Sequence, residues 1–184
     1  MSLVMLDTNI LVDFVLIYLK QDREQKLPPS LRTSFRLLKM YESSTFVNVM
    51  SSWNKLELRD VLMQLRLQEK WILSGYTVKE FGDAKKEINL SKEEKEGVNQ
   101  TVSEIWKNSD RKTISYTSSD RLKIERLNRT GFSYMDILLI FQAEILGCKY
   151  FVTRDKSLQN NNILSKEFMI KIVGIREFID RLTG

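Results

Sequence analysis

The chain of 184 residues contains no histidine and a single cysteine, Cys148. Without histidine it has no Ser-His-Asp or Cys-His nucleophile system and no imidazole general base. Zinc bound by histidine is excluded as well, and one cysteine cannot supply a four-thiolate zinc site. If the protein is an enzyme, its chemistry must therefore depend on carboxylates, lysine, hydroxyl groups or a metal ion bound by oxygen atoms.

Long apolar runs and linker-forming residues are also scarce. The most apolar stretch, residues 10–19, carries Asp13 and is too short to span a bilayer. The amino terminus lacks a basic region and Asp7 interrupts its apolar run, so we expect no secretory signal. A lone cysteine forms no intrachain disulfide, so we expect a cytoplasmic protein without membrane association. Two prolines and seven glycines leave little room for linkers, and the length predicts one domain over residues 1–184.

The charged residues indicate what kind of partner the chain could bind. Lysine and arginine together number 29 against 24 aspartates and glutamates, which gives a formal net charge of +5. This basic balance favours a polyanionic partner, with nucleic acid as the leading candidate. The 24 acidic residues leave ample material for an oxygen-ligated site, so the question becomes which of them converge.

Short apolar runs alternate with amphipathic helical patterns along the chain. The predicted strands cover residues 3–6, 45–50, 112–117, 149–153 and 169–173. The predicted helices cover residues 8–20, 28–40, 52–72, 120–128, 133–146 and 175–182, together with a charged helical segment within 77–111 that contains the capping box Ser91-x-x-Glu94. Thr8 or Asn9 is expected to cap the first helix. The repeated βα order predicts an α/β fold with three α/β/α layers around a mainly parallel sheet of about five strands.

Four acidic residues fall where this fold brings side chains to one edge of the sheet. Asp7 follows the first strand, and Asp155 comes two residues after strand 149–153. Glu57 lies early in the helix after the second strand, and Asp136 lies in the first turn of the helix before strand 149–153. Parallel sheets bind ligands just outside the carboxyl ends of their strands. Four clustered carboxylates repel each other unless a cation neutralises them, which favours a hard divalent ion, Mg²⁺ or Mn²⁺.

Each of these residues also has an ordinary structural interpretation. The Asp-Thr-Asn triplet at 7–9 is typical of a helix N-cap, and Asp136 completes a Ser-x-x-Asp capping-box pattern. Glu57 fits a solvated helix residue, and Asp155 fits a polar turn. Only the joint placement of the four residues at one sheet edge argues for a functional site.

Several stretches resemble motifs of the PIN-domain nuclease family. LVMLDTNILVDF (3–14) is similar to the opening motif of the family, a hydrophobic strand that runs into Asp-Thr-Asn and an apolar helix. GFSYMDILLIFQAEILGCKYFVTRDKSL (131–158) resembles the later motif, an aspartate that opens a helix followed by a strand that ends in Thr-x-Asp. WNKLELRDVL (53–62) and IKIVGIREFIDRL (170–182) resemble the glutamate-bearing segment and the closing strand and helix. The chain is longer than compact members because of its helical segment at 77–111.

The resemblance implies an endoribonuclease that depends on Mg²⁺ or Mn²⁺ and cleaves RNA phosphodiesters with a metal-activated water. It implies that the catalytic and metal-binding residues are Asp7, Glu57, Asp136 and Asp155. It implies that the supporting polar residues are Thr8, Asn9 and Thr153. Many small prokaryotic members are VapC-like toxins, usually dimeric and inhibited by an antitoxin, so the expected partners are RNA, an antitoxin protein and a second copy of the chain.

RNA binding around an acidic site requires cations nearby, because the phosphate backbone is negatively charged. The cations nearest to the motifs are Lys55, Arg59, Arg154 and Lys156. Trp53 and Tyr134 fit either stacking on an unpaired base or, more commonly for aromatics at helix starts, burial in the core. Asp60, one helical turn after Glu57, is an alternative for the middle acidic residue.

Other classes of protein share single features of this pattern. A phosphotransferase of the haloacid-dehalogenase type needs a second aspartate two residues after the first, and position 9 is asparagine. A response-regulator receiver needs an acidic pair at the first strand, whereas Leu6 and Thr8 flank Asp7. The alternative that the sequence leaves open is a catalytically inactive PIN-like domain that binds RNA or acts as a scaffold.

Overall fold

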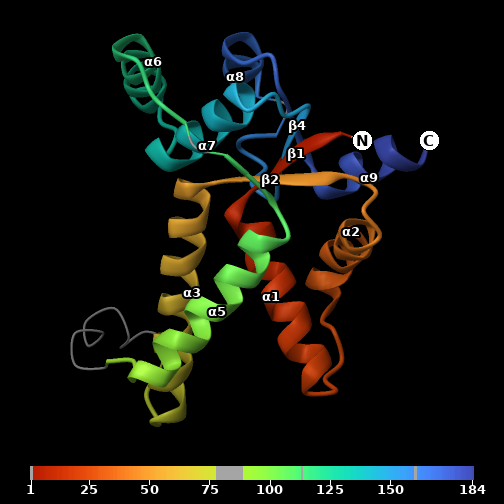
Figure 1. Cartoon of the computed structure of the whole chain (residues 1–184), viewed down its shortest axis with the longest axis vertical. Coiled ribbons are helices and arrows are strands. Elements are labelled where there is room, and N and C mark those ends of the chain that lie inside the picture. Colours follow the sequence, from red (N-terminus) through yellow and green to blue (C-terminus); the bar gives the residue numbers. More distant parts are fainter. Residues whose placement is uncertain (1, 78–88, 113, 160) are drawn as a thin grey trace.

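The computed structural model describes residues 2–77, 89–112, 114–159 and 161–184, and Figure 1 shows their arrangement. The strands are β1 (Leu3–Leu6), β2 (Val47–Ser51), β3 (Asp110–Lys112), β4 (Tyr150–Thr153) and β5 (Lys171–Gly174). The helices are α1 (Thr8–Asp22), the 3₁₀ helix η1 (Pro29–Leu31), α2 (Arg32–Glu42), α3 (Ser52–Leu73), α5 (Lys92–Lys107), α6 (Ser118–Asn128), α7 (Tyr134–Ile145), α8 (Asn162–Glu167) and α9 (Ile175–Thr183). No helix within these ranges is both long and apolar enough to cross a membrane.

A parallel sheet lies at the centre of the structure. Strands β2, β1, β4 and β5 lie side by side in that order, and the short β3 pairs in parallel with β2 at one edge. The central pairing joins β1 to β4, from Val4 opposite Tyr150 to Leu6 opposite Val152. Because the strands all run in one direction, their carboxyl ends meet at the same edge. The predicted α/β class with a parallel sheet is confirmed.

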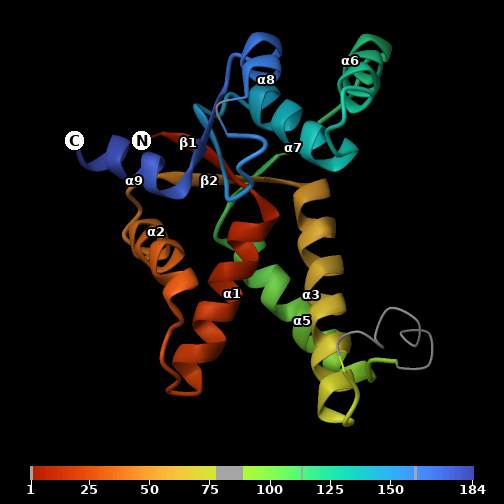
Figure 2. The ribbon, with the colours of Figure 1, turned by 180° about the vertical axis from the view of Figure 1, so that it is seen from behind.

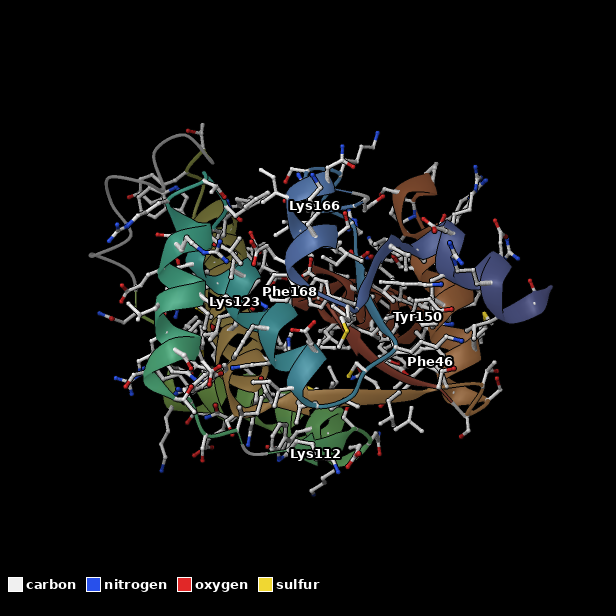
Figure 3. All side chains as sticks on the ribbon, turned by 90° about the horizontal axis from the view of Figure 1, so that it is seen from above. Phe46, Lys112, Lys123, Tyr150, Lys166 and Phe168 are labelled. Atoms are coloured by element: carbon white, nitrogen blue, oxygen red, sulfur yellow. The ribbon has the colours of Figure 1, made fainter. Side chains whose placement is uncertain are left out.

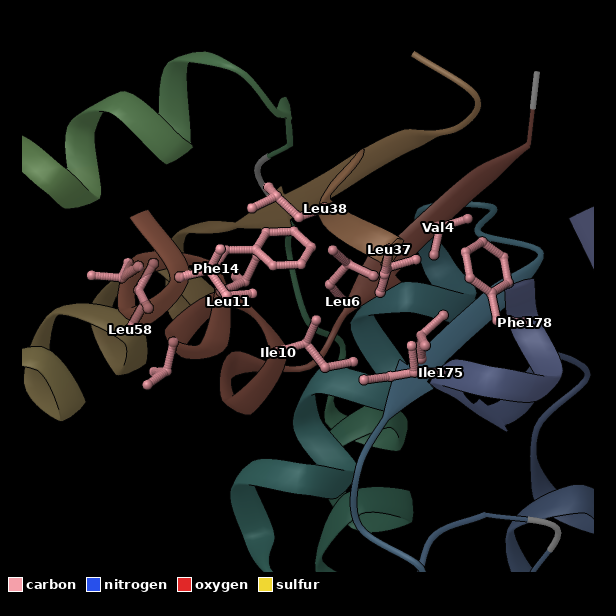
Figure 4. Close-up of a cluster of buried hydrophobic side chains, with 14 of the residues drawn as sticks. Val4, Leu6, Ile10, Leu11, Phe14, Leu37, Leu38, Leu58, Ile175 and Phe178 are labelled. Carbon is pink, nitrogen blue, oxygen red and sulfur yellow. The ribbon is translucent and has the colours of Figure 1, made fainter. Parts of the chain in front are cut away.

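Helices cover both faces of the sheet, consistent with three layers. Along β1, Val4 and Leu6 belong to one hydrophobic cluster and Met5 to the other, as the alternation of side chains along a strand requires. The first cluster includes residues of α1, α2, α3, α5 and α9, some of which Figure 4 shows. The second includes residues of α6, α7 and α8, and Figure 2 shows these helices beyond the sheet from α1 and α3. In Figure 3, seen from above, Phe46 and Tyr150 lie on the side of α9.

Two predicted elements differ from the structure. The predicted strand at 112–117 is wrong, because the strand is β3, which begins at Asp110 and ends at Lys112. Its composition is charged, and it is a strand because β2 offers an open edge, with Val49 opposite Asp110. Helix α8 was not predicted, although the Asn161 side chain accepts hydrogen bonds from the first backbone N–H groups of that helix.

The charged segment at 77–111 is described only in part, since residues 78–88 lie outside the described residues. Its second part is α5, which begins with the predicted capping box between Ser91 and Glu94. Helix α5 packs against α3, with Val102 in the first hydrophobic cluster and Lys70 of α3 paired with Glu94 at 3.0 Å. Figure 1 shows α1, α3 and α5 extending from the sheet together. The segment therefore contributes to the helical layer on the α1 side.

Candidate acidic site at the carboxyl edge of the sheet

Asp7 lies directly after β1, where it takes the N-cap position of α1. It is buried, with 4% of its surface exposed, and its backbone N–H donates to the Val152 carbonyl of β4 at 2.9 Å. The hydroxyl of Thr153 donates to Asp7 Oδ2 at 2.6 Å, whereas the Asp7 side chain makes no capping hydrogen bond. The expectation that Thr8 or Asn9 caps this helix is therefore wrong, and the Asp7 carboxylate is held by β4 instead.

The environment of Asp7 favours the neutral form of its carboxyl group. Desolvation by burial raises the pKa of Asp7 above its ordinary value. The Thr153 hydroxyl and the backbone N–H groups of Asn9 and Thr8 lower this pKa, but they offset only part of the rise. The negative charge of Asp155 raises it further. A cation placed beside Asp7 would remove most of this cost, because it favours the charged form.

Glu57 reaches the same edge from the second turn of α3. The Thr8 hydroxyl donates to Glu57 Oε2, and Asn54 Nδ2 donates to Thr8 Oγ1 at 3.1 Å. Asn54 is completely buried, and its backbone N–H donates to the N-cap hydroxyl of Ser51. Desolvation raises the pKa of Glu57, the Thr8 hydrogen bond lowers it, and the charges of Asp7 and Asp136 raise it again. Thr8 and Asn54 therefore fix the position of Glu57 relative to the start of α1.

Asp136 lies in the first turn of α7 and is half-buried. Desolvation, together with the negative charges of Asp7 and Asp155, raises the pKa of Asp136 to about 6, against a smaller effect of the Ser133 hydroxyl. The Ser133 side chain makes no capping hydrogen bond, so the capping-box interpretation of Asp136 is wrong. The raised pKa instead reflects burial first, with the negative charges of Asp7 and Asp155 adding to it.

Asp155 is the most exposed of the four acidic residues. Its backbone N–H donates to Thr153 Oγ1 at 3.0 Å, and its Oδ1 accepts a hydrogen bond from the Ser157 backbone N–H at 2.7 Å. This local side-chain-to-backbone bond is the turn that the sequence suggested. Thr153 thus contacts both Asp155 and Asp7, and it links the turn after β4 to the start of α1.

The four acidic residues form one electrostatically coupled group, which we call the acidic edge, composed of Asp7, Glu57, Asp136 and Asp155. The charge of Asp155 acts on Asp7 and on Asp136, and the charges of Asp7 and Asp136 act on Glu57. The structure therefore brings together the residues that strand order placed at one edge. The alternative, Asp60, is exposed on α3 and has no hydrogen bond or ion pair within the described residues. Glu57, rather than Asp60, faces the other acidic residues.

The predicted supporting residues differ in how they take part. Thr8 and Thr153 are buried, and each donates its hydroxyl to a carboxylate of the acidic edge. Asn9 is exposed, and only its backbone N–H acts on Asp7. The two threonines are therefore structural parts of the acidic edge, whereas the Asn9 side chain is free at its surface.

The ligand atoms at the acidic edge are oxygens, supplied by carboxylates and by the hydroxyls of Thr8 and Thr153. Such a set suits a hard divalent cation such as Mg²⁺ or Mn²⁺ and not a soft metal. Over the described residues, no three acidic or cysteine side chains are arranged to hold one ion together. Glu57 Oε2 and Asp7 Oδ2 each accept a hydrogen bond from a threonine, and no hydrogen bond among the described side chains occupies the other oxygen of either carboxylate.

A chain of polar groups behind the acidic edge was not predicted. The Ser51 hydroxyl donates to Gln142 Oε1, and Gln142 Nε2 donates to the Tyr116 hydroxyl, which ties the start of α3 to α7. The buried Asn54 Oδ1 has no hydrogen-bond partner among the described residues. The only sequence signal for this chain is a glutamine inside the otherwise apolar stretch of α7. Buried polar groups of this kind fix the relative positions of the elements that carry them.

Arg154, one of the predicted RNA-binding cations, forms an ion pair with a buried carboxylate. Its Nη1 lies 2.5 Å from Asp13 Oδ1, and the Ser34 hydroxyl donates to Asp13 Oδ2 at 2.5 Å. Asp13 is 2% exposed, whereas the Arg154 side chain is 45% exposed. Sequence reasoning treated Asp13 only as an interruption of an apolar run, because its partners lie far away in the chain.

The other three predicted cations lie at the surface. Lys55 Nζ lies 5.0 Å from the centre of the Trp106 ring, and Arg59 Nε donates to Asn99 Oδ1 at 2.9 Å. Both contacts join α3 to α5. Lys156 is exposed, with no ion pair or hydrogen bond in the described part of the chain. Lys55 and Arg59 therefore have structural contacts already, and only Lys156 extends freely beside Asp155.

Trp53 and Tyr134 are both 46% exposed, so the expectation that they belong to the core is wrong. Trp53 lies one turn before Glu57 on α3, and Tyr134 is the first residue of α7, two residues before Asp136. The helices that carry acidic residues to the sheet edge therefore each begin with a half-exposed aromatic side chain.

The sequence matches no protein-family model, and no curated protein matches it significantly.

Proposed function

We propose that the protein is a PIN-like, metal-dependent endoribonuclease that cleaves RNA phosphodiester bonds at the acidic edge. The observation that carries the proposal is the mutual coupling of four carboxyl groups from four segments of the chain, three of them with raised pKa values. Structural ion pairs bring opposite charges together, whereas like charges gathered at a ligand-binding edge indicate a site for a cation. The basic balance of the whole chain favours a polyanionic substrate.

Each residue of the acidic edge would have its own role in binding the metal ions. Asp7 and Glu57, held by Thr153 and Thr8, would present fixed oxygens to one or two Mg²⁺ or Mn²⁺ ions. Asp136, with its pKa raised to about 6, would be a further ligand, and a cation beside it would lower that pKa. The exposed Asp155 would complete the set from the open side. A bound divalent ion supplies Lewis acidity toward the phosphate and lowers the pKa of water, which a chain without histidine cannot do by itself.

A toxin inhibited by an antitoxin and an RNA-processing enzyme would use the same acidic edge, so the site does not distinguish them. The half-exposed Trp53 and Tyr134 beside the acidic edge suit an unpaired base better than a duplex, because every base offers a face for stacking. We therefore place single-stranded RNA first among the substrates.

A catalytically inactive RNA-binding or scaffold module is the second candidate. The observation that favours it is that the described acidic side chains are not arranged in a group of three around one point. In such a module the acidic edge would act without a bound cation.

The test is cleavage of a labelled single-stranded RNA in Mg²⁺ or Mn²⁺ by the wild-type chain and by the Asp7→Asn and Asp136→Asn variants. Each variant removes one charge and keeps the side-chain volume, so the fold should persist by circular dichroism. We expect metal-dependent cleavage by the wild type, loss of at least 100-fold in both variants (roughly 3 kcal/mol), and near-normal cleavage by the control Asp60→Asn. Wild-type rates in either variant would refute the site assignment.

A further inference from the structure

An open cavity of about 820 Å³ lies beside the acidic edge, at the carboxyl ends of β4 and β5. It is bounded by the start of α9 and by the segment from η1 to α2. Thr153 lines this cavity and also donates its hydroxyl to Asp7, so it connects the cavity to the acidic edge. We call it the arginine pocket, because its lining includes Arg154, Arg176 and Arg181.

An ion pair holds Arg154 in place. Its Nη1 is paired with the buried Asp13, whose other oxygen accepts the Ser34 hydroxyl. Burying a carboxylate costs desolvation free energy, and an ion pair offsets this cost only when its geometry is fixed. A guanidinium group has five N–H donors in a rigid fork, so one contact with Asp13 leaves donors for a ligand. The 45% exposure of the Arg154 side chain shows that this remainder reaches solvent.

Among the other charged residues of the pocket, one arginine has no ion pair. Arg181 donates from Nε and Nη2 to Glu177 Oε1, at 3.1 and 2.8 Å, so these two charges compensate each other. Arg176 is exposed and has no ion pair among the described residues, and neither has Asp180, one turn later on the same helix. Arg176 is therefore the pocket arginine without an ion pair, Arg154 shares its charge with Asp13 but keeps further N–H donors, and Asp180 is the opposing charge.

Neutral donors surround these two arginines. The hydroxyls of Ser30 and Thr33 line the pocket and have no hydrogen-bond partner in the described part of the chain. The N-cap of α9 is Gly174, which has no capping side chain, and Gly174 lines the same cavity with the Gln159 side chain packed against it. Arginines and hydroxyl groups are donors that proteins use for phosphate oxygens.

We propose that the arginine pocket binds a phosphate group of the RNA backbone, next to the phosphate that lies at the acidic edge. The position of this second phosphate rests on the proposed function, whereas the affinity of the pocket for phosphate does not. Arg154 and Arg176 contact the phosphate oxygens, and Ser30 and Thr33 donate to the same group. The contact holds the strand in register with the acidic edge and carries no information about base sequence.

The test measures RNA binding without cleavage, by fluorescence anisotropy of a labelled single-stranded RNA in EDTA at several salt concentrations. Arg176→Ala should weaken binding roughly five-fold and reduce the slope of log K against log salt by about 0.7, the value for one phosphate contact on a single strand. Asp180→Ala should strengthen binding, because it removes a negative charge from the pocket. The control Arg129→Ala removes an exposed arginine on the C-cap of α6, away from the pocket, and should change neither quantity.

Inorganic phosphate identifies the bound group directly. It should compete with RNA for the wild-type chain and compete less well for Arg176→Ala. The inference is overturned if Arg176→Ala behaves like Arg129→Ala, or if the wild-type chain binds no RNA. Cleavage by the wild type in Mn²⁺ separates the two proposals. If the wild type cleaves RNA but Arg176→Ala binds RNA as the wild type does, only the proposal for the arginine pocket is overturned. If RNA binding depends on Arg176 but the wild type does not cleave RNA, only the nuclease proposal is overturned.

Discussion

Thr153 and Asp7 lie 146 positions apart in the chain, yet the Thr153 hydroxyl donates to Asp7 Oδ2 at 2.6 Å. Both residues are buried, at 0% and 4% exposure, and each stands at the end of one of the two central strands. The same hydroxyl accepts the backbone N–H of Asp155 at 3.0 Å. One threonine therefore orients two of the four acidic residues, and Thr153 also borders the arginine pocket.

Thr153→Val should destabilise the fold at pH 7, because it leaves a buried carboxylate without its side-chain donor while the side-chain shape is kept. We expect a loss of about 1–3 kcal/mol in the free energy of unfolding, measured with urea. Thr153→Ser keeps the hydroxyl and should lose less. A larger loss in Thr153→Ser than in Thr153→Val would show that the methyl group, and not the hydrogen bond, is the important part.

Glu57→Gln should abolish metal-dependent RNA cleavage, whereas Asp60→Asn should leave it nearly intact. Glu57 accepts the Thr8 hydroxyl and is coupled to Asp7 and Asp136, while Asp60 is exposed on the outer side of α3. The rates are compared at one Mn²⁺ concentration and one pH. Retained cleavage in Glu57→Gln together with loss in Asp60→Asn would reverse the assignment of the middle acidic residue.

Without divalent ions, ionisation of Asp136 should destabilise the protein as the pH rises. The pKa of Asp136 is raised from 3.8 to about 6, so its stabilising contribution is complete below pH 3.8 and is lost as the pH rises through about 6. Asp136→Asn cannot ionise, so above pH 6 it should be more stable than the wild type. We expect a gain of roughly 1–2 kcal/mol, after allowing for solvent screening of a half-buried group.

The measurement for Asp136 is urea unfolding of both chains in EDTA between pH 4 and pH 8. The difference in unfolding free energy between Asp136→Asn and the wild type should grow with pH across the interval from 4 to 6 and then level off. A difference that stays constant over the whole range would show that the pKa of Asp136 is not raised in the folded protein.

Arg154→Ala should be among the more damaging single changes outside the core, since it leaves the buried Asp13 without its cation. We expect a loss of about 1–3 kcal/mol in unfolding free energy, less than for a fully buried pair because the Arg154 side chain is 45% exposed. The double variant Asp13→Asn/Arg154→Ala should be more stable than Arg154→Ala alone. If the losses of unfolding free energy in Asp13→Asn and in Arg154→Ala add up to the loss in the double variant, the ion pair between these side chains does not contribute to stability in solution.

The central sheet could be predicted because its strands carry their own signals. The apolar run covers residues 3–6 and is followed by the polar Asp7, and β1 covers the same residues, Leu3–Leu6. Ser51 lies directly before an amphipathic stretch and is the N-cap of α3, as expected. The placement of Asp7 and Glu57 at one edge followed from strand order alone, because parallel strands end together.

The remaining features depend on partners that are distant in sequence. Strand β3 has no β-branched or aromatic residue and exists because it pairs with β2, which composition cannot reveal. Asp13 lies within an apolar helix stretch, and its partners are 21 and 141 positions away. The same holds for Gln142, whose contact with Ser51 spans 91 positions. Trp53 and Tyr134 are exposed because the edge that they flank is open, which depends on the assembled fold.

The most direct measurement of the central claim is a Mn²⁺ titration followed by thermal unfolding at pH 7.5. An ion that binds the native acidic edge stabilises the fold by mass action, by about 2.7 kcal/mol at a free concentration 100 times Kd. We expect a concentration-dependent rise in Tm for the wild type and for Asp60→Asn, and none for Asp136→Asn. A wild-type Tm that does not respond to Mn²⁺ or Mg²⁺, or an equal response in all three chains, would contradict a metal site at the acidic edge.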